Sequence, residues 1–189
     1  GHGYRNTMSV GDESLDNTTA TEMTNGNRLT NLYAIDCTSN AIDYPCIGEA
    51  FIHSPTGGAV SNIGSTHFDF PTAGRAYQAE YFKLLYRDSV TAIGEAFAKQ
   101  KYPFIPFSNY DGVNRWTQLT LLLLGDPEMH VWTKLPRILA VVHPSAITLG
   151  DSALAVNVKI GAANLIGARV TAYRANHEFT SLLTDASGN

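Results

Sequence analysis

The chain has 189 residues, of which 44% are hydrophobic and 16% are charged, and its formal net charge is −4 at pH 7. This composition supplies enough apolar side chains for the core of one domain with a small partner domain. The weak negative charge gives no electrostatic basis for binding nucleic acid or an anionic membrane. The longest apolar run surrounds residues 121–124. It is far shorter than the roughly 20 residues that cross a bilayer, so no membrane span is expected.

Both ends of the chain look internal to a longer protein. It opens on Gly1-His2-Gly3 without a starting methionine, and residues 185–189 resemble the middle of a hairpin. We therefore expect the chain to be part of a longer protein. Its polar, weakly charged composition is common among exported proteins.

The first part of the chain predicts an α/β sheet. Residues 4–30 are rich in small polar side chains and predict a loop with one short helix. The apolar run 32–35 predicts a buried parallel strand, and residues 59–63 predict another. Between them, residues 45–53 suit a helix with Pro45 in its first turn. A strand, a helix and a strand at this spacing indicate a crossover connection within one sheet.

Two helical segments are expected next. Between residues 74 and 100, apolar side chains recur at steps of three or four, which predicts a helix with one apolar face. These side chains are Ala79, Phe82, Tyr86, Val90, Ile93 and Phe97. The pair Asp88-Ser89 favours helix caps and marks a place for a break. Residues 116–124 predict a buried helix, and Gly125-Asp126-Pro127 would end it.

The pattern changes in the last quarter of the chain. Short strand candidates at residues 141–142, 153–158 and 168–173 are separated by proline and glycine. Their spacing is typical of an immunoglobulin-like β-sandwich. The segment is too short for the roughly seven strands of such a sandwich, so only its beginning is expected here.

Two residues carry the candidate chemistry. His2 lies between two glycines, and Cys37 directly follows an apolar strand, where an α/β sheet presents residues to a ligand. A cysteine nucleophile needs a base that raises its thiolate fraction and protonates the leaving amine, and histidine suits both roles. Gly3 has no Cβ, so its N–H can approach a substrate oxygen. We therefore expect His2, Gly3 and Cys37 to be catalytic.

The same residues resemble, in order, the active-site run of the gingipain family of cysteine peptidases. The matching segments are His2-Gly3 and residues 24–29, 32–37, 42–49, 58–66 and 123–129. The resemblance implies a caspase-like α/β/α fold followed by an immunoglobulin-like module. On this basis residues 1–136 are the C-terminal portion of the catalytic domain, and residues 137–189 are the N-terminal portion of the β-sandwich.

The resemblance also implies secreted endopeptidase activity, in the medium or at a bacterial cell surface. Cys37 would attack the scissile carbonyl, and His2 would shuttle the proton. The N–H groups of Gly3 and Cys37 would form the oxyanion hole, and hydrolysis would pass through a thioester acyl-enzyme. The expected partners are a protein or peptide substrate and the remaining N-terminal part of the same catalytic domain.

The substrate pocket departs from the family pattern. The family orients its histidine, and forms part of its specificity pocket, with residues upstream of that histidine. After the Gly-Ser-Thr strand end, the family's pocket aromatic and pocket acid have no counterpart in this sequence. Thr66 and Asp69 are the candidate substrate-binding residues there, and Asp69 would favour a basic side chain. The Arg or Lys specificity of the best-known members is not carried over.

Other interpretations of the cysteines stay open. Cys37 would be a buried structural thiol if no base activates it. Cys46 is expected to be a packed core thiol, and a disulfide between the two is the common pattern in exported proteins. The alternative function is a catalytically inactive, peptidase-like surface or adhesin protein that uses the fold for binding.

Metal sites are the remaining alternative. His53 and His67, taken with the two cysteines, lack the close spacing of zinc ligands. Asp12, Glu13 and Asp16 follow the histidine in a loop and are candidate ligands for a structural calcium ion, but a solvated loop is the favoured interpretation. No other cofactor is expected.

Overall fold

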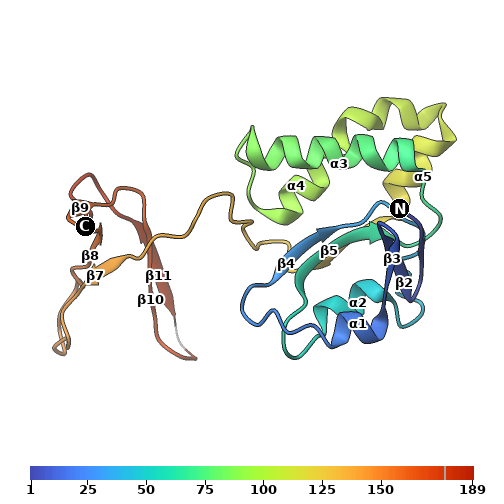
Figure 1. The fold of residues 1–189 in the computed structure, drawn as a ribbon. Helices are drawn as coiled ribbons and strands as arrows, with labels where there is room; N and C mark the ends of the chain where they lie inside the picture. The colour runs from blue at the N-terminus through green and yellow to red at the C-terminus, as the bar shows by residue number, and fades with distance from the viewer. Residues whose placement is uncertain (177) are drawn as a thin grey trace. The chain divides into compact units, whose positions relative to one another are not determined.

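The computed structural model describes residues 1–176 and 178–189. The chain divides into two compact units, Gly1–Thr133 and Lys134–Asn189 (Figure 1). Within the described residues, no helix is both long and apolar enough to cross a membrane.

The first unit is built on a mixed three-stranded sheet in the order β4-β5-β6. Its strands are β4 (Thr30–Tyr33), β5 (Ala59–Ser65) and β6 (Leu121–Gly125). β4 runs parallel to β5, and helix α2 (Ile47–Ile52) lies between them in the chain. The predicted strand–helix–strand unit is therefore confirmed.

Helices cover both faces of this sheet (Figure 1). Helices α1 (Asn17–Thr21) and α2 lie on one face, and α3 (Pro71–Tyr86), α4 (Ile93–Lys99) and α5 (Gly112–Thr120) lie on the other. Each face has its own core. Ile63 of β5 packs with Tyr77 and Tyr81 of α3, whereas Ala59 of the same strand packs with Ile47 and Phe51 of α2. The sheet is thus buried on both sides, as its apolar strands require.

The N-terminal segment is more ordered than the sequence predicts. Instead of a loop, residues 3–16 form an antiparallel sheet of β1 (Gly3–Tyr4), β2 (Thr7–Val10) and β3 (Glu13–Asp16). Gly11 turns between β2 and β3 at a φ of +63°. The strands are too short for a clear alternation of apolar and polar residues to reveal them. The short predicted helix is α1, whose N–H at Thr19 donates to the cap residue Asp16.

The long predicted helix is two helices. It begins at Pro71, three residues earlier than expected, and α3 ends at Tyr86. The break falls at the expected pair, where Ser89 adopts a φ of +58°. Helix α4 follows, and a 3-10 helix, η1 (Tyr102–Asn109), leads into α5.

The predicted helix over residues 116–124 is wrong in its second half. Helix α5 ends at Thr120, and the four leucines that follow form β6, antiparallel to β5. A short apolar run does not distinguish a buried strand from a buried helix. Pairing with β5 decides the outcome, because it satisfies the backbone groups of the leucines. Gly125, at a φ of +129°, therefore ends a strand and not a helix.

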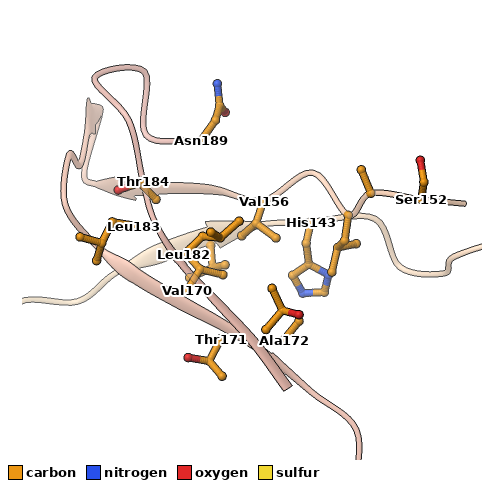
Figure 2. A pocket seen from close by; sticks show the side chains of 14 residues that line it. His143, Ser152, Val156, Val170, Thr171, Ala172, Leu182, Leu183, Thr184 and Asn189 are labelled. Carbon is orange, nitrogen blue, oxygen red and sulfur yellow. The ribbon is translucent and has the colours of Figure 1, made fainter. Parts of the chain in front are cut away.

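In the described part of the second unit, the regular elements are all strands. One sheet has the order β7 (Ala140–Val142), β8 (Asn157–Ile160), β9 (Ala163–Asn164), and a separate hairpin pairs β10 (Arg169–Tyr173) with β11 (Phe179–Leu183). The strand expected at residues 153–158 starts only at Asn157. Leu154 and Val156 instead line a cavity of about 650 Å³, together with Val170 and Leu182 of the hairpin (Figure 2).

Candidate active site

The structure brings the N-terminal residues beside the end of β4. The backbone nitrogen of Gly1 donates to the carbonyl of Ile35 at 3.2 Å. Gly3 lies so close to Asp36 that a Cβ at this position would be 2.5 Å from the carboxylate Oδ2. Only glycine fits such a contact. Gly3 thus lies against Asp36, the residue that precedes Cys37.

Cys37 has a free and partly exposed thiol. Its Sγ accepts a hydrogen bond from the backbone N–H of Asp69, with 3.4 Å between nitrogen and sulfur. The next residue, Thr38, has a φ of +57°, and its N–H donates to the carbonyl of His67 at 2.8 Å. Within the described residues the N–H of Cys37 itself has no acceptor, which leaves it available to a bound group.

His2 is exposed. Among the described residues its backbone makes a hydrogen bond, whereas its ring makes none. Its carbonyl accepts from the N–H of Ser9 at 2.8 Å. In the described part of the chain, no hydrogen bond joins the imidazole to Cys37 or to any other residue. In free enzymes, catalytic hydrogen bonds often tighten only when substrate binds. The neighbouring Gly3 lies against Asp36, but the described residues show no His2–Cys37 hydrogen bond.

The loop after β5 is held by helix α5. The N–H of Thr66 donates to the carbonyl of Thr120 at 2.9 Å. The indole N–H of Trp116 donates to the carbonyl of Phe68 at 2.7 Å, and the His67 ring meets the Trp116 ring edge-on at 5.6 Å. These contacts place the N–H of the next residue, Asp69, on the sulfur of Cys37.

The carboxylate of Asp69 points toward α3. Its Oδ1 accepts from the N–H of Phe70 at 2.8 Å, and its Oδ2 lies over Gly74, where a Cβ would be 2.6 Å away. Oδ2 is buried and has no hydrogen-bond partner among the described residues. Burial raises the pKa of the Asp69 carboxyl. Asp69 therefore contacts Cys37 through its backbone N–H, whereas its carboxyl group is directed toward α3.

Asp36 is a buried acid that the sequence analysis did not single out. Only 6% of Asp36 is exposed, and its Oδ1 has no partner in the described structure. Burial raises the pKa of the Asp36 carboxyl, and the nearby Ser39 hydroxyl offsets part of that rise. In the sequence, an aspartate after an apolar run indicates only the polar end of a strand. Two further buried residues, Asn40 and Asn62, and Trp116 of α5 were also missed.

Cys46 is a packed core thiol, as expected. It is 1% exposed, it precedes α2, and its N–H donates to Glu49. Burial raises the pKa of the Cys46 thiol. The two cysteines are both free, so the structure contains no disulfide between them.

The residues considered as alternative metal ligands are dispersed. No three His, Cys, Asp or Glu side chains of residues 1–176 and 178–189 converge on a common point. Asp12 and Glu13 are exposed at the β2–β3 turn. Asp16 is the cap of α1.

The candidate site is thus a free, partly exposed thiol after a parallel strand, with one backbone N–H donated to its sulfur. The chain belongs to peptidase family C25, whose model matches residues 1–132. No curated protein sequence matches the chain.

The fold is similar to that of known peptidases. The Arg-specific cysteine proteinase gingipain R (RGPB) is 22% identical, with a TM-score of 0.71 over 90% of this chain and 40% of that chain. The complex of Porphyromonas gingivalis RgpB pro- and mature domains is 20% identical, with a TM-score of 0.75 over 99% of this chain and 44% of that chain. A third structure, described as a protease, is 15% identical, with a TM-score of 0.69 over all of this chain and 45% of that chain. This chain therefore spans less than half the length of each.

Proposed function

We propose that the chain is part of a secreted cysteine endopeptidase in which Cys37 is the nucleophile and His2 is the general base and acid. Membership of the C25 family and the similarity of fold support this proposal. The observation that carries it is local. A free thiol in the segment after β4 accepts an N–H from Asp69, and Gly3, next to His2, lies against Asp36, the residue before Cys37.

The proposed first half of the reaction forms a thioester. His2 takes the proton of the Cys37 thiol, and Sγ attacks the carbonyl carbon of the scissile peptide bond. The oxyanion of the tetrahedral intermediate accepts hydrogen bonds from the N–H groups of Gly3 and Cys37. When the intermediate collapses, the C–N bond breaks, and His2 donates its proton to the leaving amine.

The second half regenerates the thiol. His2 takes a proton from a water molecule, and the resulting hydroxide attacks the thioester carbonyl at the same N–H groups. The C–S bond breaks, the carboxylic acid leaves, and the proton returns from His2 to Cys37. The proposed steps use side chains and backbone groups alone, with no metal ion or other cofactor.

The proposed substrate site lies along the loop after β5. Thr66 is at the end of the strand, and Asp69 contributes its N–H at Cys37. Phe68 and Phe70 flank Asp69 with exposed rings and would contact the substrate chain. Because the Asp69 carboxylate faces α3, a preference for basic residues through this acid would require it to turn outward.

We also propose the finer architecture that the family implies. The sheet with helices on both faces would be part of a caspase-like α/β/α domain, completed by a further N-terminal part of the same domain. The second unit would be part of an immunoglobulin-like module. The longer solved chains that the two units match together support both proposals.

One observation favours a different function. The His2 imidazole forms no hydrogen bond with Cys37 in the described structure. This is the geometry expected of a peptidase-like surface protein that has kept the fold only for binding. Such a protein would leave peptides intact, and its Cys37 would react with peptidyl ketones no faster than an ordinary thiol.

Hydrolysis by three single variants tests the proposal. The full-length protein, Cys37→Ala, His2→Ala and the matched control Cys46→Ala would be compared on casein and on a fluorogenic peptide library. We expect Cys37→Ala and His2→Ala to lose at least about 1000-fold in kcat and Cys46→Ala to retain it. Unchanged hydrolysis by Cys37→Ala would refute the proposal. Recovery of the protein from the culture medium or the cell surface would test secretion.

A further inference from the structure

Two asparagine side chains lie fully buried beneath the turn that follows Cys37. Asn40 and Asn62 are both 0% exposed. The amide nitrogen of Asn62 donates to Oδ1 of Asn40 at 3.1 Å, and the amide nitrogen of Asn40 donates to the carbonyl of Leu122 at 3.1 Å. The amide pair therefore joins the turn to β5 and, through Leu122, to β6.

Two glycines make room for this pair. A Cβ at Gly48, in the first turn of α2, would lie 2.7 Å from the amide nitrogen of Asn62. A Cβ at Gly64, in β5, would lie 3.1 Å from Cγ of Asn40. A Cβ at either position would therefore crowd the amide pair. The pair is thus closely surrounded, and within the described residues Oδ1 of Asn62 has no hydrogen-bond partner.

The turn that the pair holds contains an unfavourable backbone conformation. Thr38 is in the left-handed region, which residues other than glycine adopt at a cost. Residues held in this way persist only when the surroundings fix them. Here the N–H of Thr38 donates to His67, and the N–H of Asn40 donates to Ser65 at 3.0 Å. The Asn40 side chain adds a third attachment, directed at the sheet.

We propose that the Asn40–Asn62 pair is a positioning unit that fixes the Sγ and the N–H of Cys37 for reaction. This inference rests on the proposed role of Cys37 as nucleophile. A buried polar pair adds little net stability over apolar groups of the same shape, but it allows only one geometry. Positioning of the reacting sulfur is the property that such a pair supplies.

Two substitutions at Asn62 test the inference. Asn62→Leu keeps the shape of the side chain and removes the donor to Asn40 at every pH. Asn62→Asp keeps the shape and can donate to Asn40 only while its carboxyl is protonated. The matched control is Ser61→Ala on the same strand. It removes the 2.7 Å hydrogen bond from Ser61 to Asn31 at the other end of β4, away from Cys37.

The readouts are kcat, KM and the rate constant for alkylation of Cys37, measured on the full-length proteins between pH 5 and pH 9. Urea unfolding would show that each variant is folded. We expect Asn62→Leu to lower kcat about 10- to 100-fold with KM within about twofold of the parent. The deficit of Asn62→Asp relative to the parent should grow as the pH rises through the titration of its carboxyl. Ser61→Ala should retain kcat within about twofold.

Different results would overturn different claims. If both Asn62 variants retain the parent's kcat and alkylation rate, the positioning role is refuted, whereas the peptidase proposal stands. If Ser61→Ala loses kcat as much as Asn62→Leu, the effect is general destabilisation and the positioning role is refuted as well. If the parent shows no Cys37-dependent hydrolysis and no selective alkylation, the peptidase proposal falls and the inference falls with it.

Discussion

The backbone N–H of Asp69 donates to the sulfur of Cys37, with 3.4 Å between the two atoms. This hydrogen bond fixes the sulfur relative to the loop that follows β5. The donor comes from the loop after β5, and the sulfur follows β4. The hydrogen bond therefore joins the two segments that follow the carboxyl ends of parallel strands, the side of an α/β sheet where ligands bind.

The Trp116–Phe68 hydrogen bond should matter for Cys37 although neither residue touches it. Trp116→Phe removes the indole N–H and frees the loop that carries Asp69. We expect a loss of about 1 kcal/mol in the free energy of unfolding and about fivefold in the alkylation rate of Cys37. Iodoacetamide kinetics and urea unfolding would measure the two effects.

The control for Trp116→Phe is Leu119→Ala in the same helix. Leu119 is 78% exposed, so its truncation should change stability by less than about 0.5 kcal/mol and leave alkylation unchanged. Equal alkylation rates in Trp116→Phe and the parent would show that the loop does not depend on this hydrogen bond.

Gly3 should tolerate no side chain. In Gly3→Ala, the new methyl group would lie 2.5 Å from Oδ2 of Asp36 and would push His2-Gly3 away from the cysteine. We expect a destabilisation of about 1 to 3 kcal/mol and at least a tenfold loss of kcat. Gly112→Ala is the control, because a Cβ there meets nothing within 4 Å. A Gly3→Ala protein with parental kcat would show that the close contact with Asp36 has no role in catalysis.

Asp36→Asn should stabilise the protein at neutral pH and not in acid. Burial raises the pKa of Asp36 in the folded state, so the carboxyl adds stability below its unfolded pKa and loses it as the pH rises through the folded value. The neutral amide avoids that loss. We expect the free energy of unfolding of Asp36→Asn to exceed that of the parent by about 1 kcal/mol at pH 7.5. This difference should vanish below about pH 3.8, the ordinary pKa of an aspartate. Urea unfolding at both pH values measures this, and a difference independent of pH would contradict it.

Lys101 should give stability an alkaline pH dependence. Its Nζ donates to the carbonyls of Gln118 and Leu121, and burial lowers the pKa of Lys101 to about 8. Between that value and the unfolded pKa of about 10.4, the unfolded chain binds more protons, so stability rises with pH. Lys101→Met, similar in length, removes the titration.

The test of Lys101 is the difference in unfolding free energy between parent and Lys101→Met. As the pH is raised from 8 to 10, we expect the unfolding free energy of the parent to increase relative to that of Lys101→Met by about 1 kcal/mol or more. Tyrosines that titrate above pH 10 affect both proteins equally and cancel. A constant difference over this range would show that Lys101 keeps an ordinary pKa when folded.

The sequence predicts the strands and helices whose pattern of apolar and polar side chains matches their burial in the fold. The apolar runs at β4 and β5, with a helix between them, give a parallel pair because each run is buried on both faces. The break at Asp88-Ser89 is likewise visible as a pair of cap-forming residues. The leucines of β6 are not predicted, because only the unpaired edge of β5 makes them a strand.

The sequence predicts the chemical groups of the candidate site. It does not predict the buried contacts that position them. His2 and Cys37 stand out as residue types that suit a thiol reaction, next to a glycine and a strand end. The burial of Asp36 depends on Gly3, which is 33 positions away in the sequence. The Asn40–Asn62 pair depends in the same way on Gly48 and β6. Such contacts between distant segments leave no local pattern in the chain.

The central claim is that Cys37 is a reactive nucleophile, and labelling tests it most directly. The full-length protein would be treated with a peptidyl acyloxymethyl ketone at pH 7.5, and its tryptic peptides analysed by mass spectrometry. The account predicts an adduct on Cys37, none on the buried Cys46, and loss of labelling in His2→Ala. An adduct on neither cysteine, in a folded protein with both thiols free, would contradict it.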